Sequence, residues 1–402
     1  FPAIRVIPCV RDLPSIADRQ GPLNDRDGAR RASNDACSSL GNIIMSIAGD
    51  DLPVQVTHIP GITRVRYTNS TKQDVRLVTA GEDHLVRLLP SEPTATDVIP
   101  LVMEDATQNI SWIEANNKYL VTASEDGAVR LYQHALQSED DPQKATSCIR
   151  IVRREVLPVR CVSLERATES PRAAICSDEL IIRVASVEDP RQITLLTGHT
   201  RGVRAASWSP ILPLLVSCGS DGDIRVWDMS SSEGSCVKVI SNQLPALRPE
   251  SEYTSLACWH PSGRLLAIPL KTKEIGLFNA PEMLQQARSP DMWCMVSVLS
   301  ASSGVDSAEY RPSSGSISAL EFCPNGRYLA VATEDNRICI WAIDSQKVVR
   351  AHATEALVTG LSWHPSKDVL AWTDTQGQLT RWETVLGSNM PSPCEDIAVQ
   401  AP

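Results

Sequence analysis

Several features that mark common classes of protein are scarce in this chain of 402 residues. Aromatic residues make up only 4% of it, and its formal net charge of −10 is far from the basic excess of proteins that coat nucleic acid through their overall charge. No run approaches the roughly eighteen apolar residues that indicate a membrane span. We therefore expect no membrane contact, whereas a local basic patch that touches DNA stays open.

The twelve cysteines do not form a recognisable metal or disulfide framework, because no two have the Cys-x-x-Cys spacing. Several fall inside apolar patterns typical of strands, where a free thiol acts as a small hydrophobic side chain. These include Cys218, Cys258, Cys323 and Cys339. We expect no zinc site, no disulfides and a reducing compartment.

Motifs of catalysis are missing as well. The chain has no Gly-x-Ser-x-Gly nucleophile turn and no Gly-x-x-x-x-Gly-Lys-Ser/Thr phosphate loop. The residues therefore predict no catalytic group, no cofactor and no metal, and so a protein that is not an enzyme.

What the chain does contain is a repeat, clearest at residues 197–228. This stretch has a Gly-His pair, a Trp-Ser-Pro turn, an apolar run, a Ser-Asp-Gly turn and a closing Trp-Asp, in that order. The order is typical of one four-stranded blade of a WD40 propeller.

Six other segments repeat this pattern less faithfully. The closing positions of the seven units are 89, 132, 185, 227, 278, 341 and 382, with spacings of 43, 53, 42, 51, 63 and 41 residues. The usual WD40 period is about 40–45 residues, and three units are longer. The sequence predicts an all-β fold, a seven-bladed WD40 β-propeller over residues 54–386.

Residues 54–58 (VQVTH) alternate as a strand does and precede the first unit. In closed propellers such a strand completes the last blade and removes open sheet edges, so we expect it to close the ring. Residues 1–53 contain no repeat and are predicted to form a disordered or loosely attached extension. Residues 387–402 are predicted to begin a linker or tail. Insertions at 133–157, 230–251 and 279–316 are expected to be long loops between blades.

Four blades have an aspartate six residues before the closing position, namely Asp83, Asp126, Asp221 and Asp335. In the most regular blade we expect His199 to hydrogen-bond towards Asp221 and the Ser217 hydroxyl, with Trp227 packed beneath. A His–Ser–Asp set could also be a catalytic triad. We interpret it as a structural network, because this spacing is the one that braces a WD40 blade and no nucleophile turn accompanies it.

Two other polar sets have both a structural and a functional interpretation. A row of arginines two residues before the closing positions could follow a phosphate backbone, although we favour packing on the sheet and pairing between blades. These are Arg87, Arg130, Arg183 and Arg225. His260 and His364, in two Trp-His-Pro turns, are expected to be exposed turn residues and not ligands.

Two blades depart from the repeat in an unusual way. In the fifth, Pro269 follows Leu-Ala-Ile in a predicted inner strand, where proline removes a ladder hydrogen bond, and Thr272 replaces the turn aspartate. In the seventh, Gln376 takes that place within GLSWHPSKDVLAWTDTQGQL. With these features in this order, residues 54–386 resemble the N-terminal propeller of a eukaryotic replisome adaptor family. Its members are known as chromosome transmission fidelity factor, minichromosome loss protein or acidic nucleoplasmic DNA-binding protein.

The resemblance implies functions that the residues alone do not indicate. The family couples the replicative helicase to DNA polymerase α–primase and supports sister-chromatid cohesion and DNA repair. The resemblance thus implies a non-enzymatic scaffold in the nucleus, with those proteins as partners. Because trimerisation in the family belongs to a second propeller, oligomerisation of this protein would need a downstream domain.

The residue before each turn aspartate is predicted to line one rim of the propeller, namely Glu82, Glu125, Ser220 and Glu334. Since three of the four are acidic, we expect this face to prefer a basic peptide over a phosphate backbone. A solvated rim without a partner is the alternative.

For the whole propeller, the alternative function is a substrate receptor of a cullin-type ubiquitin ligase. The arginine that marks ligase docking, two residues after Trp-Asp, is replaced here by Ser230, which counts against it.

Overall fold

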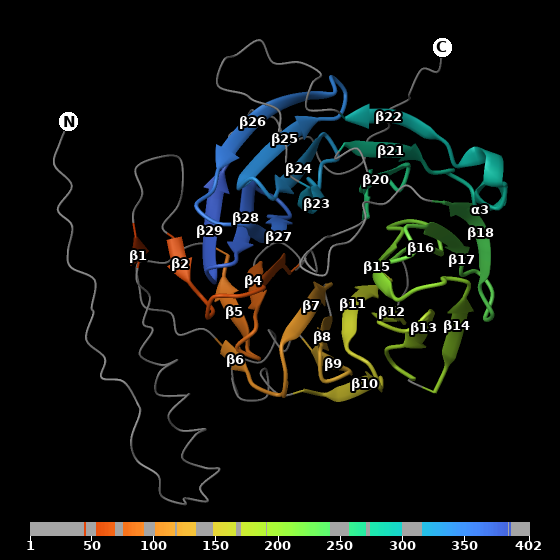
Figure 1. Ribbon diagram of the computed structural model, residues 1–402, viewed down its shortest axis with the longest axis horizontal. Coiled ribbons are helices and arrows are strands. Elements are labelled where there is room, and N and C mark those ends of the chain that lie inside the picture. The colour runs from red at the N-terminus through yellow and green to blue at the C-terminus, as the bar shows by residue number, and fades with distance from the viewer. Residues whose placement is uncertain are drawn as a thin grey trace, which may run out of the picture. The chain divides into compact units, whose positions relative to one another are not determined.

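The structure is a computed structural model that describes residues 44–45, 54–68, 75–91, 101–116, 119–133, 148–165, 170–189, 191–241, 257–270, 274–299, 316–384 and 386. In these residues the strands form seven sheets, or blades, around a common centre (Figure 1). The predicted seven-bladed, all-β propeller is confirmed. Apart from one short strand, the predicted extension at 1–53 lies outside the described residues, as do the predicted tail at 387–402 and Thr272.

Each of blades 1 to 6 runs in chain order from a strand near the centre to a strand at the outside, and blade 7 is completed by strands from the start of the chain. Blade 1 comprises β3 (Arg64–Tyr67), β4 (Arg76–Ala80), β5 (Val86–Pro90) and β6 (Leu101–Met103). Blade 2 comprises β7 (Ile110–Ala115), β8 (Tyr119–Ser124), β9 (Ala128–Gln133) and β10 (Arg150–Arg154). Blade 3 comprises β11 (Val159–Leu164), β12 (Arg172–Ser177), β13 (Ile181–Ser186) and β14 (Ile193–Thr197). Blade 4 comprises β15 (Val203–Trp208), β16 (Leu214–Gly219), β17 (Ile224–Asp228) and β18 (Ser235–Ile240).

The remaining blades follow the same plan with two additions. Blade 5 comprises β19 (Cys258–Trp259), β20 (Leu265–Pro269), β21 (Ile275–Asn279) and β22 (Met295–Leu299). A short helix, α3 (Leu284–Ala287), and a 3₁₀ turn, η1 (Pro290–Met292), precede β22. Blade 6 comprises β23 (Ile317–Phe322), β24 (Tyr328–Thr333), β25 (Arg337–Ala342) and β26 (Lys347–Ala353). Blade 7 comprises β27 (Val358–Trp363), β28 (Val369–Asp374) and β29 (Gln378–Glu383), extended by β2 (Val54–Val56) and β1 (Ile44–Met45).

The ring closes where the two ends of the propeller meet. As predicted from residues 54–58, β2 pairs antiparallel with β29, with Gln55 opposite Leu379, and β1 adds to the other side of β2. Beside this sheet, β3 lies against β27, and the hydroxyls of Thr63 and Thr359 donate to backbone carbonyls across the seam. Gly360 permits this approach, because a Cβ there would come within 3.0 Å of the Val65 nitrogen.

The middle strands explain the apolar runs of the repeat. Every residue of β8 and of β16 is buried, because each strand lies in a sheet that neighbouring blades cover on both faces. Pro269, unexpected in an inner strand, is the last residue of β20, where the loss of one donor interrupts the ladder least.

The outermost strands correct the prediction about the insertions. All three were expected to be loops between blades, yet each contains the fourth strand of a blade, namely β10, β18 or β22. These strands are largely exposed, so their sequences lack the sustained apolar pattern of the inner strands.

Tryptophans at the ends of three innermost strands join neighbouring blades. The indole N–H of Trp208 donates to the Ser163 carbonyl, that of Trp259 to Ser207 and that of Trp363 to Glu321, each at 3.1 Å. The Trp-x-Pro motif therefore does more than stop a strand, because each indole binds the innermost strand of the preceding blade.

We expect Trp363→Phe to lower the free energy of unfolding by about 1 kcal/mol more than Trp341→Phe does, because only Trp363 loses a hydrogen bond. Trp341 is equally buried, and its indole has no hydrogen-bond partner among the described residues. In blade 6 the residue equivalent to Trp363 is Phe322, so this position of a blade accepts a phenyl ring. Urea unfolding of the two variants measures the difference, and equal losses would show that the bond between the blades contributes nothing.

Candidate functional site

The turn of blade 4 carries a chain of hydrogen bonds in which each donor has an acceptor. The Trp227 indole N–H donates to Ser217 Oγ at 2.8 Å, and Ser217 Oγ lies 2.8 Å from His199 Nε2. His199 Nδ1 lies 3.0 Å from Asp221 Oδ2. Because an ionised Asp221 can only accept, the histidine carries its proton on Nδ1 and accepts the Ser217 hydroxyl proton at Nε2.

Local sequence makes this geometry possible. A Cβ at Gly219 would lie 2.3 Å from Asp221 Oδ1 and 2.4 Å from His199 Nδ1, so only glycine fits between them. The backbone N–H groups of Thr200 and Asp223 also donate to the Asp221 carboxylate. Although burial acts to raise it, these bonds and the one from His199 bring the pKa of Asp221 below its usual value.

The same three residue types could form a catalytic triad, but Ser217 has no exposed surface. Its hydroxyl accepts from Trp227 and donates to His199, and a nucleophile must instead reach a substrate. The arrangement therefore braces the turn of the blade.

Blade 1 contains a similar network with a member that was not predicted, His58. Its Nδ1 lies 2.8 Å from Asp83 Oδ1 and its Nε2 lies 2.9 Å from Thr79 Oγ1. Arg87 binds the other oxygen of Asp83 at 2.7 Å. His58 precedes Asp83 by 25 residues, whereas His199 precedes Asp221 by 22, so the spacing of the repeat did not point to His58.

The other turn carboxylates are satisfied in different ways. Asp126 accepts from the Thr107 hydroxyl at 2.8 Å, and Asp335 accepts from the Thr333 hydroxyl at 2.5 Å. In blade 7, where Gln376 replaces the aspartate, the carboxylate of Asp374 accepts the backbone N–H groups of Gln376 and Gln378. The carboxylate of Asp374, two positions before Gln376, thus accepts the backbone hydrogen bonds of this turn in place of the missing aspartate.

The row of arginines is largely committed to ion pairs. Arg87, Arg130 and Arg183 bind carboxylates four residues earlier in their own blades, at 2.7, 2.5 and 2.7 Å. Pairing is therefore mainly within blades and not between them as expected. Arg183 also binds Glu155 at 2.8 Å, and this buried carboxylate takes the place of the histidine in blade 3. Guanidinium groups paired in this way are poorly placed to follow a phosphate backbone.

The two turn histidines are less exposed than predicted. His364 is only 4% exposed, its Nδ1 accepts two backbone N–H groups, and its ring packs edge-on against Tyr67 of blade 1 at 5.0 Å. His260 is half-buried, with Nε2 2.9 Å from the Gly326 carbonyl of blade 6. The expectation of exposed side chains was wrong because each ring fills the space between its own turn and the next blade.

The four predicted rim residues lie in equivalent turns between the second and third strands of their blades. We call this the turn face; it comprises these turns and the segments that lead into each blade. Ser220 Oγ accepts from Arg204 at 2.8 Å, Glu125 binds Arg160 at 3.2 Å, and Glu82 accepts the Ile62 N–H at 2.9 Å. Glu334 is exposed.

Arg160 and Arg204 reach the rim because of an irregularity that five innermost strands share. Each has a β-bulge at the same position, which re-aims one side chain. The bulged residues are Ser111, Arg160, Arg204, Ser318 and Thr359. Arg160 binds Asp178 at 2.8 Å, and Arg204 lies 3.9 Å from the same carboxylate. Ion pairs thus connect the rim of blades 2, 3 and 4.

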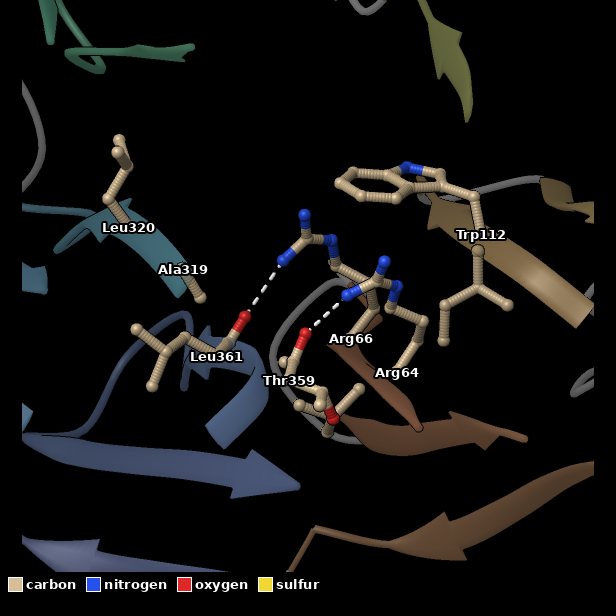
Figure 2. A pocket seen from close by; sticks show the side chains of 10 residues that line it. Arg64, Arg66, Trp112, Ala319, Leu320, Thr359 and Leu361 are labelled. Carbon is tan, nitrogen blue, oxygen red and sulfur yellow. Dashed lines mark hydrogen bonds between the residues drawn. The ribbon is translucent and has the colours of Figure 1, made fainter. Parts of the chain in front are cut away.

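The centre of the ring is filled by two arginines of β3 (Figure 2). Arg66 lies 2.9 Å from Glu321 and 3.8 Å from Glu114, and it donates to the Leu361 carbonyl at 2.8 Å. Arg64 donates to the carbonyls of Ser111 and Thr359.

Both guanidinium groups lie over the ring of Trp112, at 5.0 and 5.7 Å from its centroid. The hollow that remains among these residues is about 20 Å³, room for about one water molecule. The centre is therefore a packed hub and not a ligand pocket.

In the part of the chain that the structure describes, no cluster of three or more His, Cys, Asp or Glu side chains is placed to bind a metal ion. Among those same residues, no helix has the length and apolar character needed to cross a membrane.

Comparison with known proteins agrees with this architecture. The first WD40 domain of WDHD1, as a family model, matches residues 55–381. The chain belongs to this family. It is 26% identical to minichromosome loss protein 1 of Schizosaccharomyces pombe over 333 residues, which are 83% of this chain and 36% of that protein.

Two vertebrate relatives are similar to the same region. Identity to WD repeat and HMG-box DNA-binding protein 1 is 23% over 303 residues for Homo sapiens and 25% over 325 residues for Xenopus laevis. These alignments cover 67% and 80% of this chain, but only 25% and 26% of the relatives. The chain thus spans about a quarter to a third of the length of the relatives it matches.

The buried histidines predict that the propeller loses stability in mild acid. Burial lowers the pKa of His58, His199 and His260 below 6.5, and it lowers that of His364 to about 4. In the unfolded chain these side chains bind protons near pH 6.5, so between that pH and the lower folded-state pKa the unfolded state holds more protons. The free energy of unfolding should therefore fall below about pH 6.5, by up to about 1.4 kcal/mol per pH unit for each histidine.

Urea unfolding between about pH 7.5 and about pH 5 tests this prediction. His364→Asn retains an acceptor for the backbone N–H groups but cannot be protonated, so it should have a shallower pH dependence than the native protein. A native stability that is constant across this range would contradict the prediction.

Proposed function

We propose that this protein is a non-enzymatic adaptor in DNA replication, and that its propeller binds other proteins through the turn face. The observation that carries the proposal is the match of residues 55–381 to the first WD40 domain of WDHD1, a propeller of the scaffold type. The names of the relatives, which refer to minichromosome loss and to DNA binding, support it.

The finer proposal follows the family resemblance. The protein acts in the nucleus, contacts replicative helicase components and DNA polymerase α–primase, and supports sister-chromatid cohesion and DNA repair. The relatives are about three to four times as long as the matching part, so such links would also involve regions beyond this propeller.

The charge of the turn face supports a protein client over a phosphate backbone. Among its described residues, the exposed carboxylates are Glu104, Asp105, Glu334 and Glu355, against one exposed cation in the turns and leading segments, Arg201. Arg160 and Arg204 are tied to the ion pairs of the rim. A basic peptide is therefore the client that we propose for this face.

Affinity purification of the intact gene product tests the proposed function. The native protein should recover subunits of the replicative helicase and of DNA polymerase α. Recovery of a cullin adaptor without these subunits would favour the ubiquitin-ligase alternative and contradict the proposal.

Charge reversal tests the role of the turn face within the same experiment. Glu334→Lys together with Glu355→Lys should weaken a basic client about tenfold or more, because both side chains are exposed. Reversal of Glu82 and Glu125 would also break their contacts to Ile62 and Arg160, so a folding check has to accompany it. The control is Glu233→Lys, an exposed carboxylate in the loop between β17 and β18, away from the turn face. Unchanged affinity in the double variant would remove this role.

Direct binding of DNA is the remaining outcome. Binding that depends on phosphate contacts would weaken steeply as salt is raised. Binding of a short DNA duplex could depend strongly on salt and be lost when arginines, but not glutamates, are reversed in charge. DNA would then replace the basic peptide as the proposed ligand of this propeller.

A further inference from the structure

One edge of blade 2 differs from the acidic character of the rest of the protein. β10 and the residues beside it contain both arginines and exposed aliphatic side chains. Ile149 is 47% exposed, Ile151 44%, Val156 93% and Leu157 39%. Arg150 and Arg154, from the same stretch, are also exposed. We call residues 149–157 the β10 edge.

The apolar surface continues onto blade 3. Leu195 of β14 is 53% exposed and pairs across the sheet with Arg183, whose guanidinium binds Glu155 in the β10 edge. Leu180, in the turn of the same blade, is 49% exposed. Grouped aliphatic side chains of this exposure favour a binding surface over a scatter of single residues.

The backbone of β10 is available for pairing as well. It is the last strand of its sheet, at the outside of the ring in Figure 1, and no described strand pairs with its outer side. Blade 7 shows that a blade of this propeller accepts a fifth strand, because β1 extends the sheet beyond β2.

The charge of the β10 edge is positive. Arg150 donates to the carbonyls of Val187 and Glu188, so no carboxylate neutralises it in these contacts, and Arg154 has no partner among the described residues. Arg153 shares the carboxylate of Glu155 with Arg183. A protein with a net charge of −10 thus presents a cationic strip beside aliphatic side chains.

We propose that the β10 edge binds an extended acidic peptide of another protein as a fifth strand of blade 2. Backbone hydrogen bonds to β10 supply affinity, and alternate side chains of the peptide supply specificity. The register of β10 places Arg150 on one face of the sheet and Arg154, with Ile151, on the other. Acidic side chains on both faces of the peptide therefore lie against the two arginines, and apolar ones contact Ile151, Val156 and Leu157. Residues 149–154 of this surface lie outside the turn face, whereas Val156 and Leu157 belong to the segment that leads into blade 3. The proposed client has the opposite charge to the one proposed for the turn face.

Two other occupants fit the observations less well. A second copy would place the β10 arginines opposite one another, and like charges across a strand pair are unfavourable. Nucleic acid would satisfy Arg154, but its phosphates would gain nothing from Val156, Leu157 and the isoleucines.

The test uses a fluorescein-labelled peptide of about eight residues, the length of an ordinary strand, with valines and glutamates in adjacent pairs so that glutamates lie on both faces. Fluorescence anisotropy with the whole chain should show saturable binding. Arg150→Glu with Arg154→Glu should weaken it at least about tenfold. The matched control is Lys347→Glu with Arg350→Glu on β26, the outer strand of blade 6, which should leave the affinity unchanged. Amide hydrogen exchange should slow at residues 149–154 on binding.

Three results would overturn the proposal. One is equal binding of the peptide by the native protein and the β10 variant, both shown to be folded by circular dichroism. Another is equal binding of a peptide with N-methylated backbone amides, because it cannot pair as a strand. The last is tighter binding of a peptide with lysine in place of glutamate, tighter binding of a single-stranded oligonucleotide, or self-association of the protein that the β10 variant alters.

Discussion

A single guanidinium, that of Arg66, connects blade 1 with the three blades around it at the point where the ring closes. It binds Glu321 of blade 6, the Leu361 carbonyl of blade 7 and Glu114 of blade 2, and it lies over Trp112. All three charged side chains are less than a quarter exposed. Removing one partner from a fully buried ion pair lowers the free energy of unfolding by about 3–5 kcal/mol. Because these side chains are partly exposed, we expect a loss at the lower end of that range or below it.

This hub matters because, elsewhere in the described part of the ring, the blades contact their neighbours. Each tryptophan bond joins two adjacent blades, and each turn network braces one blade. Only at the seam between blades 7 and 1 must segments distant in the sequence meet, through β2 on β29 and β3 against β27. A closed ring holds the turn face and the outer edges at fixed positions, and that is what an adaptor requires to present several partners to one another.

Much of the fold could be predicted because the repeat specifies it. The apolar runs, turns and closing positions that recur along the chain predicted seven blades, and the alternation at residues 54–58 predicted the strand that closes the ring. The outer strands β10, β18 and β22 were mistaken for loops because half-exposed strands carry a weak pattern. His364 was placed in solvent because its neighbour, Tyr67, is almost three hundred residues away in the sequence.

The polar residues were harder to predict than the strands. Asp221, Ser217 and His199 lie together as their spacing suggested, whereas His58 and the carboxylate of Asp374 perform related tasks at positions that break the repeat. Arg64 and Arg66 gave no signal, because a pair of arginines on one strand looks like a solvated face until the ring is closed around them. Contacts among residues far apart in the chain, and not local preference, decide these roles.

The most direct test of the hub is native-state hydrogen exchange of Arg66→Met, which keeps the length of the side chain and removes its charge. If the guanidinium holds the seam, amides of β3 and β27 will exchange faster than in the native protein, while those of β15 and β16, on the far side of the ring, will keep their protection. Unchanged exchange in β3 and β27 would contradict a hub at Arg66.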